Sequence, residues 1–164
     1  MKENPLYLQI MKRNWWKYLI WLVVAFYIYT IFRNSMMIAD ASNEMSYALT
    51  YKLIDYLSRY HITVEFHSFH HYVRKMAHFC EFAGLGFLVG LANHIAPFFR
   101  SRLLNFCLFL FLVPFTDEML QQFFDGRSTQ FSDMLIDGAG ILFGGFVIYV
   151  IILICKDLFH LKQS

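Results

Sequence analysis

The stretch LLNFCLFLFLVPFTDEMLQQFF, residues 103–124, is apolar for most of its length. As an α-helix it would rise about 33 Å, which is enough to cross a hydrocarbon core of about 30 Å. Two adjacent carboxylates, Asp117 and Glu118, interrupt the run near its end. A carboxylate at the centre of a membrane helix is costly, so such groups normally face the interior of a bundle or a watery cavity. The stretch therefore predicts a membrane-spanning helix that forms one wall of a polar site.

The composition of the whole chain also indicates a membrane protein. Of 164 residues, 58% are hydrophobic, 20% are aromatic and only 16% are charged, whereas soluble domains contain about 25% charged residues. The net charge of +2 is small, and the sequence has no basic stripe with interleaved aromatic residues. We therefore expect no nucleic-acid partner.

Four apolar runs are candidates for membrane spans: residues 15–32, 76–99, 103–124 and 133–155. Residues 34–72 carry too many charges to cross, but apolar residues recur there at helical spacing from Met45 to Tyr60. We expect an amphipathic helix in this segment, followed at residues 61–66 (HITVEF) by a short strand or an extended connector. The sequence thus predicts an all-α membrane protein, a bundle of four transmembrane helices plus an amphipathic extracytoplasmic helix between the first and second spans.

Lysine and arginine residues near the span ends indicate the orientation. With four spans, the basic residues before the first span, between the second and third, and after the fourth share one side, which we take as cytoplasmic. We expect a multi-pass protein of the cell membrane with both termini in the cytoplasm. The expected segments are a cytoplasmic N-terminus with the first span (1–33), an extracytoplasmic amphipathic segment (34–72), a three-helix core (73–156) and a cytoplasmic tail (157–164).

Polar residues on three of these spans fall at a similar depth, in the outer half of the membrane. Arg74, His78 and Glu81 share one helix face at i, i+4 and i+7. Buried charges of this kind pair with one another or line a functional cavity. The candidate acid–base residues are His78, Glu81, Asp117, Glu118 and Asp133. The candidate binding residues are Arg74, Lys75, Gln121, Arg127 and Asp137.

Two other interpretations use many of the same residues. A buried salt-bridge network would fix helix register, although an apolar bundle needs no such network to span a bilayer. A metal site would use the histidines that precede and open the second span, with oxygen ligands from Asp117, Glu118 and Asp133. These histidines are His67, His70, His71 and His78, of which the first and third have the i, i+4 spacing that can share a metal. We assign no metal ligand from the sequence, and the cofactor is unknown at this point.

Three pieces of the sequence resemble the VanZ-like family. They are RKMAHFCEF (74–82), DEMLQQFFDGRS (117–128) and SDMLIDGAGILFGG (132–145), which match the family's R-K-x-x-H-x-x-E, D-E-x-x-Q, G-R and D-x-x-x-N elements in order. Asp137 stands where the family usually has asparagine, which adds a negative charge to the site. The resemblance covers roughly residues 72–145, the predicted three-helix core.

The resemblance implies an integral membrane protein of the cell envelope. The founding member is associated with resistance to teicoplanin, a lipid-bearing glycopeptide antibiotic that binds cell-wall precursors. The implied partners are therefore membrane lipids, a lipid-linked cell-wall precursor, or the lipoglycopeptide itself. The resemblance names a family and a phenotype but no reaction, so whether the protein is an enzyme stays open.

Two functions follow from the residues and the resemblance together. In the first, Arg74, Lys75 and Arg127 hold an anionic lipid headgroup, and His78, Asp117 or Glu118 supplies acid–base chemistry that modifies it. In the second, the same cations bind or shield without catalysis and alter drug or lipid access at the outer leaflet. A metal-dependent membrane hydrolase is a third, less favoured function.

Overall fold

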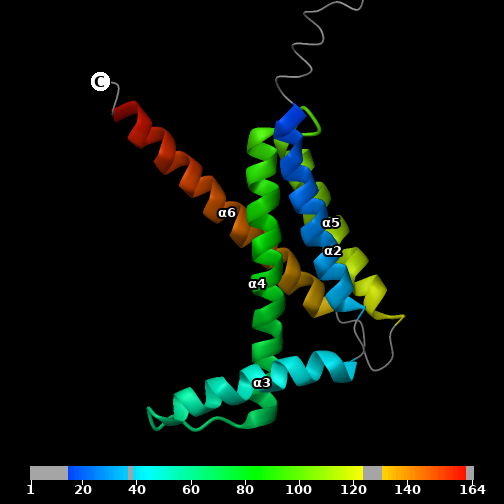
Figure 1. Cartoon of the computed structure of the whole chain (residues 1–164), viewed down its shortest axis with the longest axis vertical. Helices are drawn as coiled ribbons and strands as arrows, with labels where there is room; N and C mark the ends of the chain where they lie inside the picture. Colours follow the sequence, from blue (N-terminus) through cyan, green and yellow to red (C-terminus); the bar gives the residue numbers. More distant parts are fainter. Residues whose placement is uncertain (1–14, 37–38, 124–130, 162–164) are drawn as a thin grey trace, which may run out of the picture.

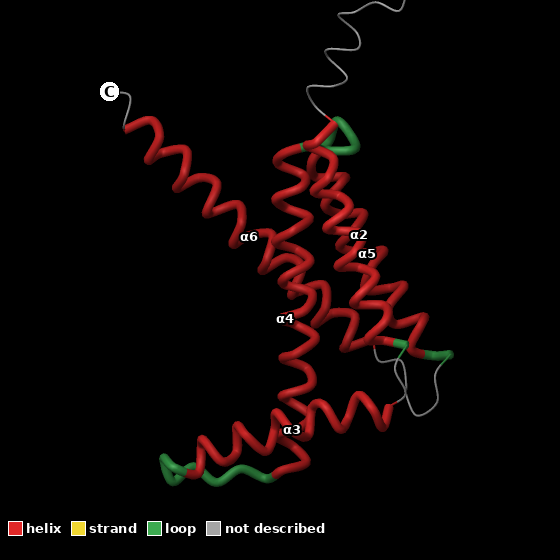
Figure 2. Tube along the Cα trace, viewed as in Figure 1, coloured by secondary structure: helices red, strands yellow, loops and turns green. Residues whose placement is uncertain are grey.

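The computed structural model describes residues 15–36, 39–123 and 131–161. Within these ranges the chain forms one 3-10 helix and five α-helices and contains no strand (Figure 2). The all-α class is confirmed. The elements are η1 (Trp15–Tyr18), α2 (Leu19–Ser35), α3 (Ala39–Ser58), α4 (Phe66–Ile95), α5 (Arg102–Gln121) and α6 (Phe131–Leu161).

Three helices are long and apolar enough to cross a membrane. They are α4, α5 and α6, the last over Phe131–Leu158. Helix α2 is apolar as well, but its 17 residues make it shorter than these three. Three of the four predicted spans are therefore matched by helices of sufficient length.

Helix α4 begins at Phe66, well before the predicted start of the second span at residue 76. The reason is a cap that the apolar pattern does not reveal. Glu65 has extended backbone, and its carboxylate accepts hydrogen bonds from the backbone N–H groups of His67 (2.9 Å) and Ser68 (2.7 Å). Residues 62–65 are consequently an extended connector rather than a strand. Helix α5 is capped in the same way, by Ser101, whose hydroxyl accepts from Leu104 N–H at 3.2 Å.

The closest helix contact is the crossing of α4 and α6, after which α6 diverges from the other helices toward its C-terminal end (Figure 1). Glycines make the crossing possible. A methyl group at Gly144 would overlap the backbone of Ala83, and one at Gly86 would overlap the backbone of Ile141. Small residues let membrane helices approach closely enough for backbone-to-backbone packing. This crossing fixes the start of α6 against the middle of α4.

Helix α2 packs against α4 and α5 along an apolar core that includes Val24, Ile31 and Phe82. Polar contacts secure its start and its middle. The indole N–H of Trp21 donates to the Ala96 carbonyl at 2.7 Å. Farther along, the Tyr27 hydroxyl, which lies over Gly84, donates to the Glu81 carbonyl at 3.0 Å. The middle of α2 is thereby held beside the middle of α4.

Helix α3 lies across the start of α4 (Figure 1). The helix expected between the first two spans is present, but its contact face differs from the predicted apolar stripe. The contact is made by Tyr47, whose ring centroid lies 4.5 Å from that of His70, and by Tyr51, 4.7 Å from Phe66. Leu49 is 47% exposed. The described ring contacts with the start of α4 are therefore made by these two tyrosines.

Candidate functional site

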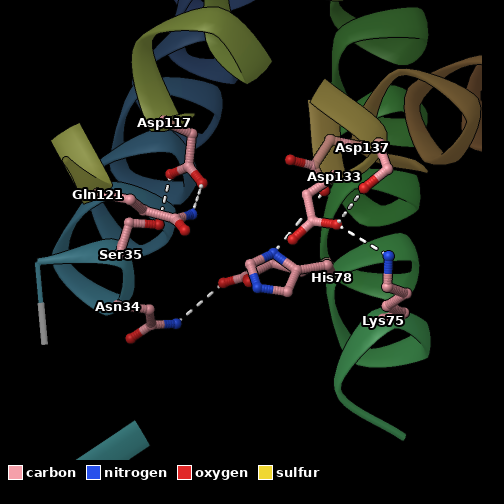
Figure 3. Close-up of polar contacts among 10 residues, drawn as sticks. Asn34, Ser35, Lys75, His78, Asp117, Gln121, Asp133 and Asp137 are labelled. Carbon is pink, nitrogen blue, oxygen red and sulfur yellow. Dashed lines mark hydrogen bonds and ion pairs between the residues drawn. The ribbon is translucent and has the colours of Figure 1, made fainter. Parts of the chain in front are cut away.

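Buried and half-buried polar side chains from four helices meet where α2 and α5 end and α6 begins. Asp117 and Asp137 are fully buried (0% exposed), and Glu118 and Gln121 are nearly so. The sequence predicts contributions from the second, third and fourth spans, and the structure brings the corresponding helices α4, α5 and α6 together (Figure 3). We refer to this group as the polar cluster; it consists of Ser35, His78, Asp117, Glu118, Gln121 and Asp137.

Helix α5 supplies the most firmly held carboxylate of the polar cluster. Asp117 Oδ1 accepts a hydrogen bond from Ser35 Oγ at 2.5 Å, and Asp117 Oδ2 accepts one from Gln121 Nε2 at 2.9 Å (Figure 3). The Gln121 contact follows from the i, i+4 spacing on one helix. The Ser35 contact comes from α2 and was missed, because nothing in a lone serine after the first apolar run signals a long-range partner.

Glu81 lies on the side of α4 that faces α2. Its Oε1 accepts a hydrogen bond from Asn34 Nδ2 at 2.9 Å (Figure 3). Asn34 was also missed by the sequence analysis. Together with Ser35 it makes the end of α2 a wall of the site.

Helix α6 contributes two carboxylates that differ in exposure and in hydrogen bonding. Asp133, at the mouth, accepts from Lys75 Nζ at 3.1 Å, in an ion pair that is about one-quarter exposed. Asp137, one turn deeper, is fully buried, and neither of its carboxylate oxygens has a hydrogen-bond partner among the described residues. Its nearest cationic group in that part of the chain is His78, with 3.7 Å between Nδ1 and Asp137 Oδ1, which is too long for a good hydrogen bond.

Arg74 lines a separate cavity of about 490 Å³ at the junction of α3 and α4. His67, His70, His71 and Tyr47 line it too. We call this the histidine cavity. Three of the four predicted histidines are therefore gathered at the start of α4. The fourth, His78, lies in the polar cluster, about 10 Å along the helix axis from His71. Arg127 lies outside the described residues, as do Gly126 and Ser128.

One grouping among the described residues could hold a metal ion. Ligand atoms of His78, Asp117 and Asp137 all lie within 4.8 Å of one another. Two of these residues, His78 and Asp117, were part of the metal site considered from the sequence, and Asp137 was not. His67, His70 and His71 lie at the start of α4 and do not join this grouping.

A family model described as VanZ/LLP1 matches residues 18–155. The chain belongs to the VanZ/LLP1 family. Comparison with curated proteins and with solved structures found no significant match. With three helices suited to crossing a membrane, the chain is a VanZ-like membrane protein of a family linked to antibiotic resistance.

The family match extends beyond the residues that carried the resemblance in the sequence. It includes α2 and α3 as well as the three-helix core. The α2 residues that contact the acidic side chains, Asn34 and Ser35, therefore lie inside the VanZ-like region.

Proposed function

We propose that this VanZ-like protein binds the anionic headgroup of a membrane lipid or lipid-linked cell-wall precursor in the outer half of the membrane. The observation that carries the proposal is the arrangement along α4. Arg74 lines the histidine cavity, and His78 in the polar cluster follows it by one helical turn, about 6 Å along the axis. A headgroup held by Arg74 would therefore lie beside buried acid–base groups.

The chemistry of the histidine cavity suits a phosphate. The guanidinium group of Arg74 matches phosphate oxygens with two parallel N–H donors. His70 is buried between aromatic rings, and its Nε2 has no hydrogen-bond partner among the described residues. That nitrogen is buried, and it would become accessible to a ligand if the imidazole turned toward the cavity. The aromatic rings of Tyr47 and Tyr72, which also line the cavity, would contact the apolar part of the same ligand.

The proposed membrane arrangement completes this function. Helix α2 joins α4, α5 and α6 as a fourth span, both termini are cytoplasmic, and α3 lies on the outer surface with Leu49 and Leu53 toward lipid. Their exposure of 47% and 37% supports this placement. Labelling an Arg100→Cys variant with a membrane-impermeant thiol reagent tests it, with all three native cysteines first replaced by serine. Reaction from outside the cell would overturn the orientation.

Lipid retention tests the binding function. Wild type, Arg74→Gln and Arg59→Gln would be purified and mixed with a polyprenyl phosphate, phosphatidylglycerol or zwitterionic phosphatidylcholine, and bound lipid would be counted by native mass spectrometry. Arg59 is the matched control, because it is 71% exposed on α3 and pairs with Asp55. We expect Arg74→Gln to lose most of its anionic lipid and Arg59→Gln to retain it. Equal retention in both variants would reject the proposal.

Binding has two versions with different cellular consequences. If the polar cluster modifies the headgroup, Glu118→Gln should abolish reduced susceptibility to a teicoplanin-type lipoglycopeptide while lipid retention stays intact. If the protein only shields lipid or drug at the outer leaflet, the same variant should keep both. Susceptibility of cells that express each variant, compared with lipid retention by the purified protein, separates the two versions.

A further inference from the structure

The carboxylate of Asp137 is incompletely satisfied. It is 0% exposed, and both of its oxygens lack a hydrogen-bond donor within the described ranges. Its ion-pair contact with His78 Nδ1 is 3.7 Å long. Burying an ionised carboxylate without hydrogen bonds is very costly. Protonation would remove the charge, but it would still leave the oxygens without hydrogen bonds. A bound cation would satisfy both the charge and the lone pairs.

We propose that His78, Asp117 and Asp137 bind a divalent metal ion. Each residue comes from a different helix of the core, and their ligand atoms already lie within 4.8 Å of one another. In a tetrahedral zinc site with bonds of about 2.0–2.1 Å, neighbouring ligand atoms are about 3.4 Å apart. Side-chain rotations that move the ligand atoms by on the order of 1 Å would therefore bring them to bonding distance from an ion.

The surroundings of Asp117 are those of a metal ligand. Ser35 Oγ and Gln121 Nε2 each donate to one of its oxygens, and a carboxylate oxygen that accepts a hydrogen bond can also coordinate an ion because it carries two lone pairs. Hydrogen bonds of this kind orient ligating carboxylates in metal sites. The other two ligands are placed by helix packing, since the glycine crossing holds α6 against α4.

The donor set selects a chemical class of ion. One imidazole nitrogen and two carboxylate oxygens suit Zn²⁺ or Mn²⁺, whereas Mg²⁺ and Ca²⁺ favour oxygen donors alone. Two carboxylates neutralise the ion, which makes the site tolerable inside an apolar bundle. Three protein ligands leave a coordination position open for water or a phosphate oxygen. Metal binding goes beyond the proposed lipid function, because it can occur without any lipid.

The test uses zinc alone on purified protein in lipid-free detergent. Chelator-treated wild type, His78→Gln and Asp137→Asn would be equilibrated with Zn²⁺, and bound zinc would be measured by equilibrium dialysis and elemental analysis. Tetrahedral Co²⁺ absorption would report the ligand set. Two matched controls are Asp133→Asn, one turn away on the same helix, and His70→Gln in the histidine cavity.

We expect one zinc per chain in wild type and in both controls. Affinity should fall more than about 100-fold in His78→Gln and Asp137→Asn, because even substitutions in the outer shell of a zinc site cost about 10–100-fold. Wild type without stoichiometric zinc would overturn the proposal, and this result needs no variant to fold. Zinc lost in His70→Gln but retained in Asp137→Asn would overturn it too. Lipid retention by Arg74→Gln is a separate measurement, so either proposal can fail alone.

Discussion

Two buried polar groups at opposite ends of the α4–α5 pair differ in how completely they are hydrogen-bonded. At one end, Asn93 Nδ2 donates to the Arg102 carbonyl at 2.7 Å, and Asn105 Nδ2 donates to Asn93 Oδ1 at 3.1 Å. Asn105 Oδ1 in turn accepts from Phe99 N–H at 3.1 Å. We call these two side chains the asparagine pair. At the other end, Asp137 has no hydrogen-bond partner in the described part of the chain.

The difference separates a structural role from a functional one. The asparagine pair is a closed network that ties the loop between α4 and α5 to both helices, so its amide groups cost nothing to bury. The polar cluster is a network with an open position at Asp137. Native proteins rarely leave such groups unsatisfied without a functional reason. Four substitutions test this comparison, in order of decreasing effect.

The largest effect is expected at the glycine crossing that lies between the two regions. Gly144→Val would force α6 away from Ala83, and we expect it to lower the free energy of unfolding by about 4 kcal/mol or more, as gross overpacking does. Thermal unfolding in detergent would measure the loss. Gly138→Ala is the control, because the added methyl group meets no atom closer than 3.9 Å among the described residues. Equal destabilisation by both would show that the crossing has no special role.

Asn105→Leu should have the next largest effect. It leaves the Phe99 N–H and the Asn93 Oδ1 without these hydrogen-bond partners, and unsatisfied buried groups cost about 1–3 kcal/mol each. We expect a loss of about 2–4 kcal/mol in chemical unfolding. Thr116→Val on the same helix is the control, since its hydroxyl only bonds the Leu112 carbonyl one turn back. A change at Asn105 no larger than at Thr116 would contradict the closed-network interpretation.

Asp137→Asn should behave in the opposite way. In chelator-treated protein we expect the unfolding free energy to stay within about 1 kcal/mol of wild type or to rise, because the substitution removes a buried charge that has no hydrogen bond and only a 3.7 Å contact with His78. Adding zinc should raise the melting temperature of wild type only. A large loss of stability without metal would mean that Asp137 has a structural partner after all, and the contrast with the asparagine pair would fail.

The smallest effect concerns a carboxylate that is exposed and fully hydrogen-bonded. Two backbone N–H groups and the Ser68 side chain lower the pKa of Glu65 from its usual 4.5 to about 2. Because the folded pKa is depressed, the charge stabilises the start of α4 above pH 4.5, and this contribution is lost as the pH falls toward 2. Wild type should therefore melt slightly above Glu65→Gln at pH 7, with the difference shrinking at pH 3. A difference that does not depend on pH would contradict this assignment.

Local patterns in the sequence predicted much of this architecture. The apolar runs identified α4, α5 and α6, and helical spacing identified the Asp117–Gln121 pair. The cost of burying a charge predicted that the carboxylates would pair with cations such as Lys75, although it did not identify Asp133 as the partner of Lys75. Each of these follows from periodicity or from the cost of burying a charge.

Contacts set by tertiary packing were not predictable in this way. Ser35 reaches Asp117 because α2 packs against α5, and no periodicity encodes which helix lies beside which. The distance of the first three histidines from His78 was not predictable either, because the early start of α4, capped by Glu65, puts them on separate helix turns. The helical spacing of apolar residues likewise predicted helix α3, but it did not predict that Tyr47 would contact α4.

The shortness of α2 has a consequence for the bilayer itself. Between Lys17 and Arg33 the helix rises only about 24 Å, against a hydrocarbon core of about 30 Å. Lipids accommodate such hydrophobic mismatch by thinning locally. In the proposed four-span arrangement, the thinned region surrounds the end of α2, where Asn34 and Ser35 contact Glu81 and Asp117. Headgroups there would lie nearer the mid-plane, which shortens the path from the outer leaflet to the buried acids.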